Sequence, residues 1–116
     1  MTDAVPGQTY QFDVEGIGTF TARRRTMRDS AAIPNHAISI LGGWPGHPAI
    51  LEQATRLAEL EMLITRAPEE WDIQSLDPLD KDDQAKLDKV HGGLRDAEER
   101  FRRELKERRS TLGRSA

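Results

Sequence analysis

The chain of 116 residues contains no cysteine, so disulfides and thiolate metal sites are excluded and a reducing compartment suits it. Aromatic residues make up only 5% of the chain. This argues against recognition of nucleic-acid bases by stacking, which needs several aromatic platforms. No apolar run approaches the roughly 20 residues of a membrane-spanning helix. Residues 1–9 lack the basic and apolar regions of a signal peptide, so we expect none.

The length of the chain allows one domain rather than two. Hydrophobic residues make up 36% and charged residues 32% of the chain, which indicates a modest core and extensive solvated helix surface. We predict a single α+β domain over residues 8–109, with flexible ends at 1–7 and 110–116.

Charge is unevenly distributed along the chain. Residues 41–83 contain ten acidic and three basic side chains, a net charge of −7. Residues 84–116 contain six acidic and ten basic side chains, a net charge of +4. An acidic middle followed by a basic end predicts electrostatic pairing, either within a homo-oligomer or with a partner. The alternative is two solvated helix faces.

The clearest strand signal lies near the N-terminus. Residues 8–15 alternate between apolar and polar side chains, and residues 19–23 do so again after Gly16-Ile17-Gly18. This pattern predicts a β-hairpin. Because an isolated hairpin is marginally stable in water, its apolar face should pack on a helix or pair with strands of another subunit.

Two helices are predicted next. The first, over residues 26–41, begins at a Thr26–Asp29 capping pair and contains Pro34, which should kink or restart it. Its expected buried side is apolar: Ile33, Ala37, Ile40 and Leu41. The second, over residues 48–66, has the broad apolar stripe typical of a core helix. The connector 68–79 should contribute three apolar side chains to the core: Trp71, Ile73 and Leu76.

A long, charged third helix is predicted to begin near Asp80. Its apolar residues recur at steps of three and four, as a heptad-like seam: Leu87, Val90, Leu94, Ala97, Phe101 and Leu105. Gly92-Gly93 should weaken the helix by about 1 kcal/mol per glycine. Such a seam fits either the core or a contact with a second chain. For the second case, Leu94, Phe101 and Leu105 are candidate protein-interaction residues.

Polar side chains with catalytic or metal-binding potential are scattered. His36, His47 and His91 lack the spacing of a ligand set, and the serines stand in no nucleophile-elbow context. The densest carboxylate cluster, residues 77–83, is better explained by acids that stabilise a helix N-terminus. We therefore predict no enzyme activity, catalytic residue, metal site or cofactor.

Arg23-Arg24-Arg25 and Arg28 form the sharpest basic cluster. The guanidinium group of arginine can donate two parallel hydrogen bonds to a phosphate. However, Arg23 and Arg25 are expected on the solvent side of a strand that could be an edge strand, where charge deters wrong pairing. Nucleic-acid binding is therefore not the preferred interpretation. Arg24 and Arg28 are kept as candidate contacts to a protein partner.

Several short segments resemble tail assembly chaperones of tailed phages, prophages and gene transfer agents. The segment 10–16, then 20–25 running directly into the Thr/Asp pair of 26–29, is similar to the opening of that family. Segments 67–72 and 97–102 are similar to tail-region proteins. The resemblance covers roughly residues 8–105.

The resemblance implies a non-catalytic assembly factor of the host cytoplasm. Such a factor coats the helical tape-measure protein and keeps it soluble. It is displaced when tail-tube subunits polymerise around that protein, and it is absent from the finished particle. Two alternatives remain open: a structural tail or head–tail joining protein retained in the virion, and a small nucleic-acid-binding regulator that uses the Arg23–Arg28 cluster.

Overall fold

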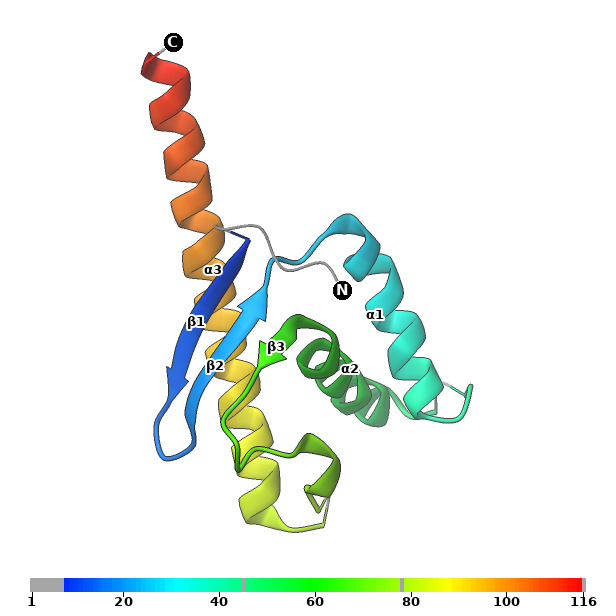
Figure 1. The fold of residues 1–116 in the computed structure, drawn as a ribbon. Helices are drawn as coiled ribbons and strands as arrows, with labels where there is room; N and C mark the ends of the chain where they lie inside the picture. The colour runs from blue at the N-terminus through cyan, green and yellow to red at the C-terminus, as the bar shows by residue number, and fades with distance from the viewer. Residues whose placement is uncertain (1–7, 45, 78, 116) are drawn as a thin grey trace.

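The computed structural model describes residues 8–44, 46–77 and 79–115, with side chains up to residue 109. The elements follow in the order β1 (Thr9–Val14), β2 (Gly18–Arg23), α1 (Met27–Ile40), α2 (Pro48–Leu63), β3 (Ile64–Arg66), a 3₁₀ turn η1 (Ile73–Ser75) and α3 (Lys81–Ser115). This confirms an α+β fold with an N-terminal hairpin and three helices, the last of them long (Figure 1). The predicted flexible segment 1–7 and the side chains of 110–116 lie outside the described residues.

The sheet has three antiparallel strands in the order β1-β2-β3. Phe12 on β1 lies opposite Phe20 on β2, and their rings stack with centroids 5.3 Å apart. The hairpin turn ends at Gly18, whose φ of +140° favours glycine. A Cβ there would also lie 2.6 Å from Cγ of Pro68, so both backbone conformation and space require glycine.

The third strand corrects a prediction. Residues 64–66 were expected to continue the second helix, but α2 ends at Leu63 and the chain becomes extended at Ile64. Ile64 and Thr65 are β-branched and suit a strand, and Ile64 pairs with Ala22 on the otherwise unpaired edge of β2. The hairpin therefore gains its extra strand from its own chain, and β2 is the central strand.

Helix α3 covers the apolar face of the hairpin (Figure 1). Its buried seam consists of Leu87, Val90, Leu94 and Ala97, as predicted for the core alternative. A helix of 35 residues is about 52 Å long, which accounts for the 54 Å longest extent of the molecule. The C-terminal part of α3 consequently projects past the end of the sheet (Figure 1).

Helices α1 and α2 pack on each other beside the sheet (Figure 1). The capping box of Thr26 and Asp29 starts α1, as predicted, and α1 continues through Pro34 as one helix. Ile33 and Ala37 are buried, but Ile40 is 38% exposed, contrary to expectation. This end of the helix pair lies away from the sheet and α3 (Figure 1), so neither of these adds to the partial burial of Ile40. Three residues of the connector between α2 and α3 pack against the core, as predicted: Trp71, Ile73 and Leu76.

Candidate functional site

The arginines at the end of β2 point in different directions. Arg23 forms a two-pronged ion pair with Asp29, at 2.6 and 2.7 Å, and donates to the carbonyl of Met62. Arg25 donates from Nε to Glu98 at 2.8 Å and from Nη2 to Glu59. The expectation that both lie on the solvent side of a possible edge strand is wrong. Since β2 is central, α1, α2 and α3 surround its end and offer these side chains carboxylates.

Glu59 is the centre of this buried network, with only 4% of its surface exposed. Besides Arg25, it meets Nε2 of His91 at 2.9 Å and Nη1 of Arg95 at 3.3 Å. His91 is thus a tertiary contact rather than a surface histidine. Sequence reasoning missed Glu59 and Glu98, although acids within apolar helix stripes were an available signal, because their partners lie 34 and 73 positions away.

The ion pairs lower the pKa of two of these carboxylates, Glu59 and Asp29. Burial alone would raise the pKa of Glu59, but the hydrogen bonds from His91 and Arg25 outweigh burial and hold it at about 2. The hydrogen bonds from Arg23 lower the pKa of Asp29 to about 2 against the opposing effect of burial. Fully paired, buried ions of this kind fix the relative positions of the elements that carry them, which here are the end of β2, α1, α2 and α3.

Above this network lies a groove of about 730 Å³, which we call the α3 groove. It runs between the projecting part of α3, the start of β1 and the connection from β2 to α1. Its lining is Gln8, Tyr10, Arg24, Arg25, Thr26, Met27, Ser30, Glu98, Phe101, Arg102, Leu105, Lys106 and Arg109.

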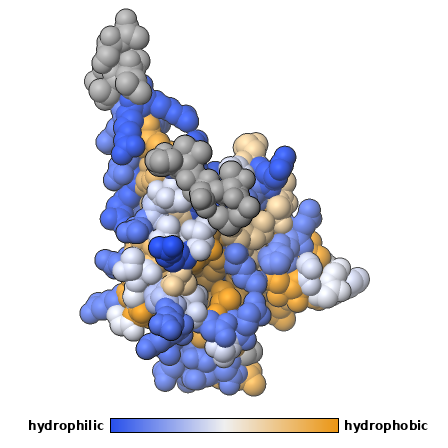
Figure 2. All heavy atoms as spheres, in the orientation of Figure 1, coloured by the Kyte–Doolittle hydropathy of each residue, from blue (hydrophilic) through white to orange (hydrophobic). Residues whose placement is uncertain are grey.

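The floor of the α3 groove is apolar. The ring of Tyr10 stacks on Phe101 with centroids 4.9 Å apart and an interplanar angle of 28°. Leu105 continues the seam one turn further and is only partly buried, and Met27 at the start of α1 is 87% exposed. Figure 2 shows hydrophobic and hydrophilic side chains side by side on the projecting part of α3. The apolar seam therefore runs past the sheet into a region that the described residues leave open to solvent.

The hydroxyl of Tyr10 is a buried polar atom without a hydrogen-bond partner among the described residues. Tyr10 as a whole is 9% exposed. Burial, followed by the nearby charge of Glu98, raises its pKa above the ordinary value for tyrosine. The phenol consequently stays neutral, and its hydroxyl is enclosed by protein atoms beneath the α3 groove.

Cations line the groove on both walls. Arg24 stands on the side of β2, and Arg102, Lys106 and Arg109 stand on α3. None of the four forms an ion pair with another residue that the structure describes. The acid of the lining, Glu98, is held by Arg25. The α3 groove is therefore positively charged.

The structure separates the predicted interaction residues. Arg24, Phe101 and Leu105 come together in the α3 groove. Leu94 is fully buried beneath the hairpin, and Arg28 is exposed on α1 outside the groove lining. The sequence did not identify Tyr10 as part of a site, because its strand alternation predicts only that it faces inward.

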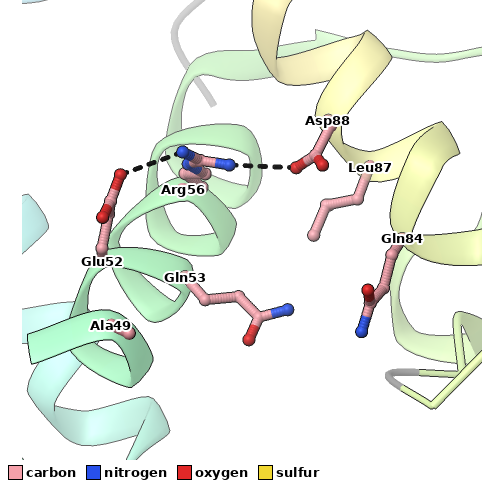
Figure 3. Close-up of a pocket in the computed structure, with 7 residues that line it drawn as sticks. All are labelled: Ala49, Glu52, Gln53, Arg56, Gln84, Leu87 and Asp88. Atoms are coloured by element: carbon pink, nitrogen blue, oxygen red, sulfur yellow. Dashed lines mark hydrogen bonds and ion pairs between the residues drawn. The ribbon is translucent and has the colours of Figure 1, made fainter. Parts of the chain in front are cut away.

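A smaller hollow of about 190 Å³ lies between the first turns of α2 and α3 (Figure 3). Arg56 spans one side of it and binds Glu52 at 2.9 Å and Asp88 at 3.0 Å. Both acids are largely exposed. We interpret this arrangement as exposed ion pairs that link α2 to α3 rather than as a ligand site.

Other classes of site find no support in residues 8–44, 46–77 and 79–109. No three histidines or acids there are grouped so that they could hold a metal ion. The acids at the start of α3 cap backbone groups instead: Asp80 accepts from the amide of Asp82, and Asp83 accepts from that of Asp77. No helix in the described part of the chain is long and apolar enough to cross a membrane.

Comparisons of the chain with protein-family models, with curated proteins and with solved structures found no match. The geometry of the α3 groove is therefore the basis for a functional assignment, together with the resemblance of the short sequence segments.

Proposed function

We propose that this protein is a non-catalytic phage tail assembly chaperone that binds the tape-measure protein in the host cytoplasm. The observation that carries the proposal is the α3 groove, where the apolar seam of α3 continues past the sheet and no other residue in the described part of the chain covers it. Phe101 and Leu105 present apolar surface there, flanked by cations. The resemblance of residues 8–105 to tail assembly chaperones supplies the identity of the client.

The properties of the groove suit a temporary partner. A long helical client exposes apolar stripes that aggregate unless they are covered. A groove with a small apolar floor and a charged rim covers such a stripe with limited buried area, and so allows later displacement by tail-tube subunits. The fold gives the groove a firm base, because the Arg25 network fixes α3 against β2 and α2.

The arrangement of the arginines favours a protein client over nucleic acid. Arg23 and Arg25 are occupied by internal carboxylates. Of the Arg23–Arg28 cluster, this leaves Arg24 and Arg28 for phosphate contacts. The second candidate, a structural tail or head–tail joining protein, would use the same surface but remain in the virion.

The test is co-expression with the tape-measure protein encoded by the same genome. We expect the tape-measure protein to stay soluble and to co-purify with this chain, and Leu105→Asp to abolish both effects. Leu79→Asp is the matched control, because Leu79 is exposed outside the groove. A tape-measure protein that is equally soluble without this chain contradicts the proposal.

Mass spectrometry of purified particles separates the two candidates, since a chaperone is absent from them and a tail component is present.

We also propose that the chain forms a homo-oligomer through its acidic middle and basic end. Light scattering at low salt measures this association, and a monomer mass at high protein concentration contradicts it.

A further inference from the structure

We propose that the α3 groove binds one amphipathic α-helix of a partner protein, with an apolar stripe on Phe101 and Leu105 and a row of acidic side chains facing the groove cations. The inference rests on the proposed function only for the identity of the client. It adds the chemistry of the client segment that the groove recognises.

The spacing of the groove residues on α3 fits a helix. Phe101 and Leu105 are one turn apart, and Arg102, Lys106 and Arg109 form a basic ridge directly beside them. This is the arrangement of a coiled-coil seam with a charged flank. A second helix lying along the projecting part of α3 matches this periodicity of three and four, whereas an extended strand presents side chains with a period of two.

The charge of the groove selects an acidic helix. Arg24 faces the groove from the wall opposite the α3 ridge, so cations lie on both sides of the apolar floor. A symmetric contact between the grooves of two copies would place these cations against one another, which is unfavourable. The rings of Tyr10 and Phe101 stack on each other, and Tyr10 is buried, so the floor offers no free platform for nucleic-acid bases.

The Tyr10 hydroxyl lies beneath the floor of the groove. A buried donor without an acceptor is unfavourable in the free protein. Protein atoms enclose the hydroxyl, so an occupant of the groove contacts the apolar floor and not this donor. The nearest acid of the lining, Glu98, already accepts from Arg25.

The probe is a synthetic helical peptide of about five turns, with leucines at heptad spacing and glutamates along one flank. A second peptide carries lysine in place of each glutamate, and a third has the leucines scrambled. We expect the glutamate peptide to bind at least about tenfold more tightly than either control. Fluorescence anisotropy measures the affinity. Its decrease at high salt should be moderate, because the apolar contact remains.

Two charge-reversed double variants localise the site. Arg102→Glu with Lys106→Glu changes the groove ridge, and Arg100→Glu with Arg108→Glu makes the same change in net charge outside the lining. All four residues are exposed on α3, so both variants should fold. We expect the first to reduce affinity for the glutamate peptide by at least about tenfold and the second by less than about threefold.

Tyr10→Phe separates the stability of the free protein from recognition in the groove. Removal of an unpaired buried hydroxyl should raise the melting temperature of the free protein. Peptide affinity should change by less than about threefold, because the enclosed hydroxyl does not reach the occupant and the apolar floor is kept. A raised melting temperature with nearly unchanged affinity supports recognition through the apolar floor and the cations, whereas a large loss of affinity contradicts it.

Four results would overturn the inference. Three are equal binding of the glutamate and lysine peptides, equal effects of the two double variants, and tight, steeply salt-dependent binding of a 20-base-pair DNA that the groove variant abolishes. The fourth is a dimer of this chain that the groove variant dissociates and the control variant does not, which would assign the groove itself, rather than the basic end in general, to a second copy. If the peptide fails while the tape-measure protein co-purifies, only this inference is wrong. The reverse pattern contradicts the proposed function and leaves the groove assignment intact.

Discussion

Gly93 on α3 lies directly against Phe12 on β1. A Cβ on Gly93 would lie 3.1 Å from Cδ2 of Phe12 and 3.3 Å from Cγ2 of Val14, whereas a Cβ on Gly92 would meet nothing within 4 Å. The two adjacent glycines thus differ in role. Gly93 allows the helix to approach the hairpin closely, and Gly92 has no such contact.

Alanine substitution separates the two glycines. Gly92→Ala should raise the free energy of unfolding by about 0.5–1 kcal/mol, because alanine favours the helix and the site has space. Gly93→Ala gains the same helix propensity but forces Phe12 or Val14 to shift, which typically costs about 1–3 kcal/mol. Urea unfolding of both variants, followed by the fluorescence of Trp71 beside Phe20, measures the difference. Equal stabilisation by both substitutions would show that the contact of Gly93 with Phe12 and Val14 is loose enough to accept a methyl group.

The neighbouring residues Arg24 and Arg25 should also respond differently to replacement by methionine. Arg25→Met leaves the buried carboxylates Glu59 and Glu98 without their shared guanidinium, and such a loss typically costs about 3–5 kcal/mol. Arg24→Met removes a cation that has no ion pair among the described residues, so stability should change by less than about 0.5 kcal/mol. Chemical unfolding at neutral pH checks this. Similar losses for both variants contradict the assigned network.

Acid should destabilise the protein through Asp29 and Glu59. Both have a native pKa of about 2, below the ordinary values of 3.8 and 4.5, so the unfolded chain binds more protons between these limits. The stabilisation is complete above about pH 5 and is lost as the pH falls towards 2. Each group contributes a slope of up to about 1.4 kcal/mol per pH unit.

The contribution of Asp29 can be isolated with Asp29→Asn. This variant should take up about one proton fewer on unfolding in acid, so its free energy of unfolding should depend less steeply on pH. Asp96→Asn is the control, because Asp96 is exposed on α3. Free energies of unfolding at several pH values between 2 and 6 provide the measurement. An unchanged slope for Asp29→Asn excludes the ion pair with Arg23 as a source of acid sensitivity.

Alanine substitutions along the α3 seam should show a gradient in stability. Leu94→Ala empties a fully buried site and should cost about 2–5 kcal/mol. Phe101→Ala should cost less, because Phe101 is only partly buried and stacks on Tyr10 at the groove. Leu105→Ala should change stability by less than about 0.5 kcal/mol. Thermal melting checks the order, and a cost at Leu105 equal to that at Leu94 would show that the seam is core throughout.

Local signals predicted much of this fold from the sequence. The alternation of residues 8–15, the Thr26–Asp29 capping box and the spacing of the α3 seam each depend on neighbours within a few positions. The strand at residues 64–66 could not be predicted in this way, because its helical pattern is overridden by pairing with Ala22, some 42 positions earlier.

The candidate site was harder to predict than the fold. The sequence singled out Phe101, Leu105 and Arg24, which share the groove. It could not tell that Arg23 and Arg25 turn to internal acids while Arg24 does not, because the partners of Arg25 lie 34 and 73 positions away. The orphaned hydroxyl of Tyr10 likewise depends on packing that no local pattern encodes.

The packing of the hairpin on α3 limits when the hairpin can fold during synthesis on the ribosome. The hairpin is synthesised before α3, and Glu98, which closes over Arg25, follows Arg25 by 73 positions. At about 5–20 residues per second, the nascent hairpin waits about 4–15 s for the helix that covers its apolar face. The hairpin and α3 can therefore take up their native packing only after residue 98 has been synthesised, and until then the apolar face of the hairpin lacks the helix that covers it.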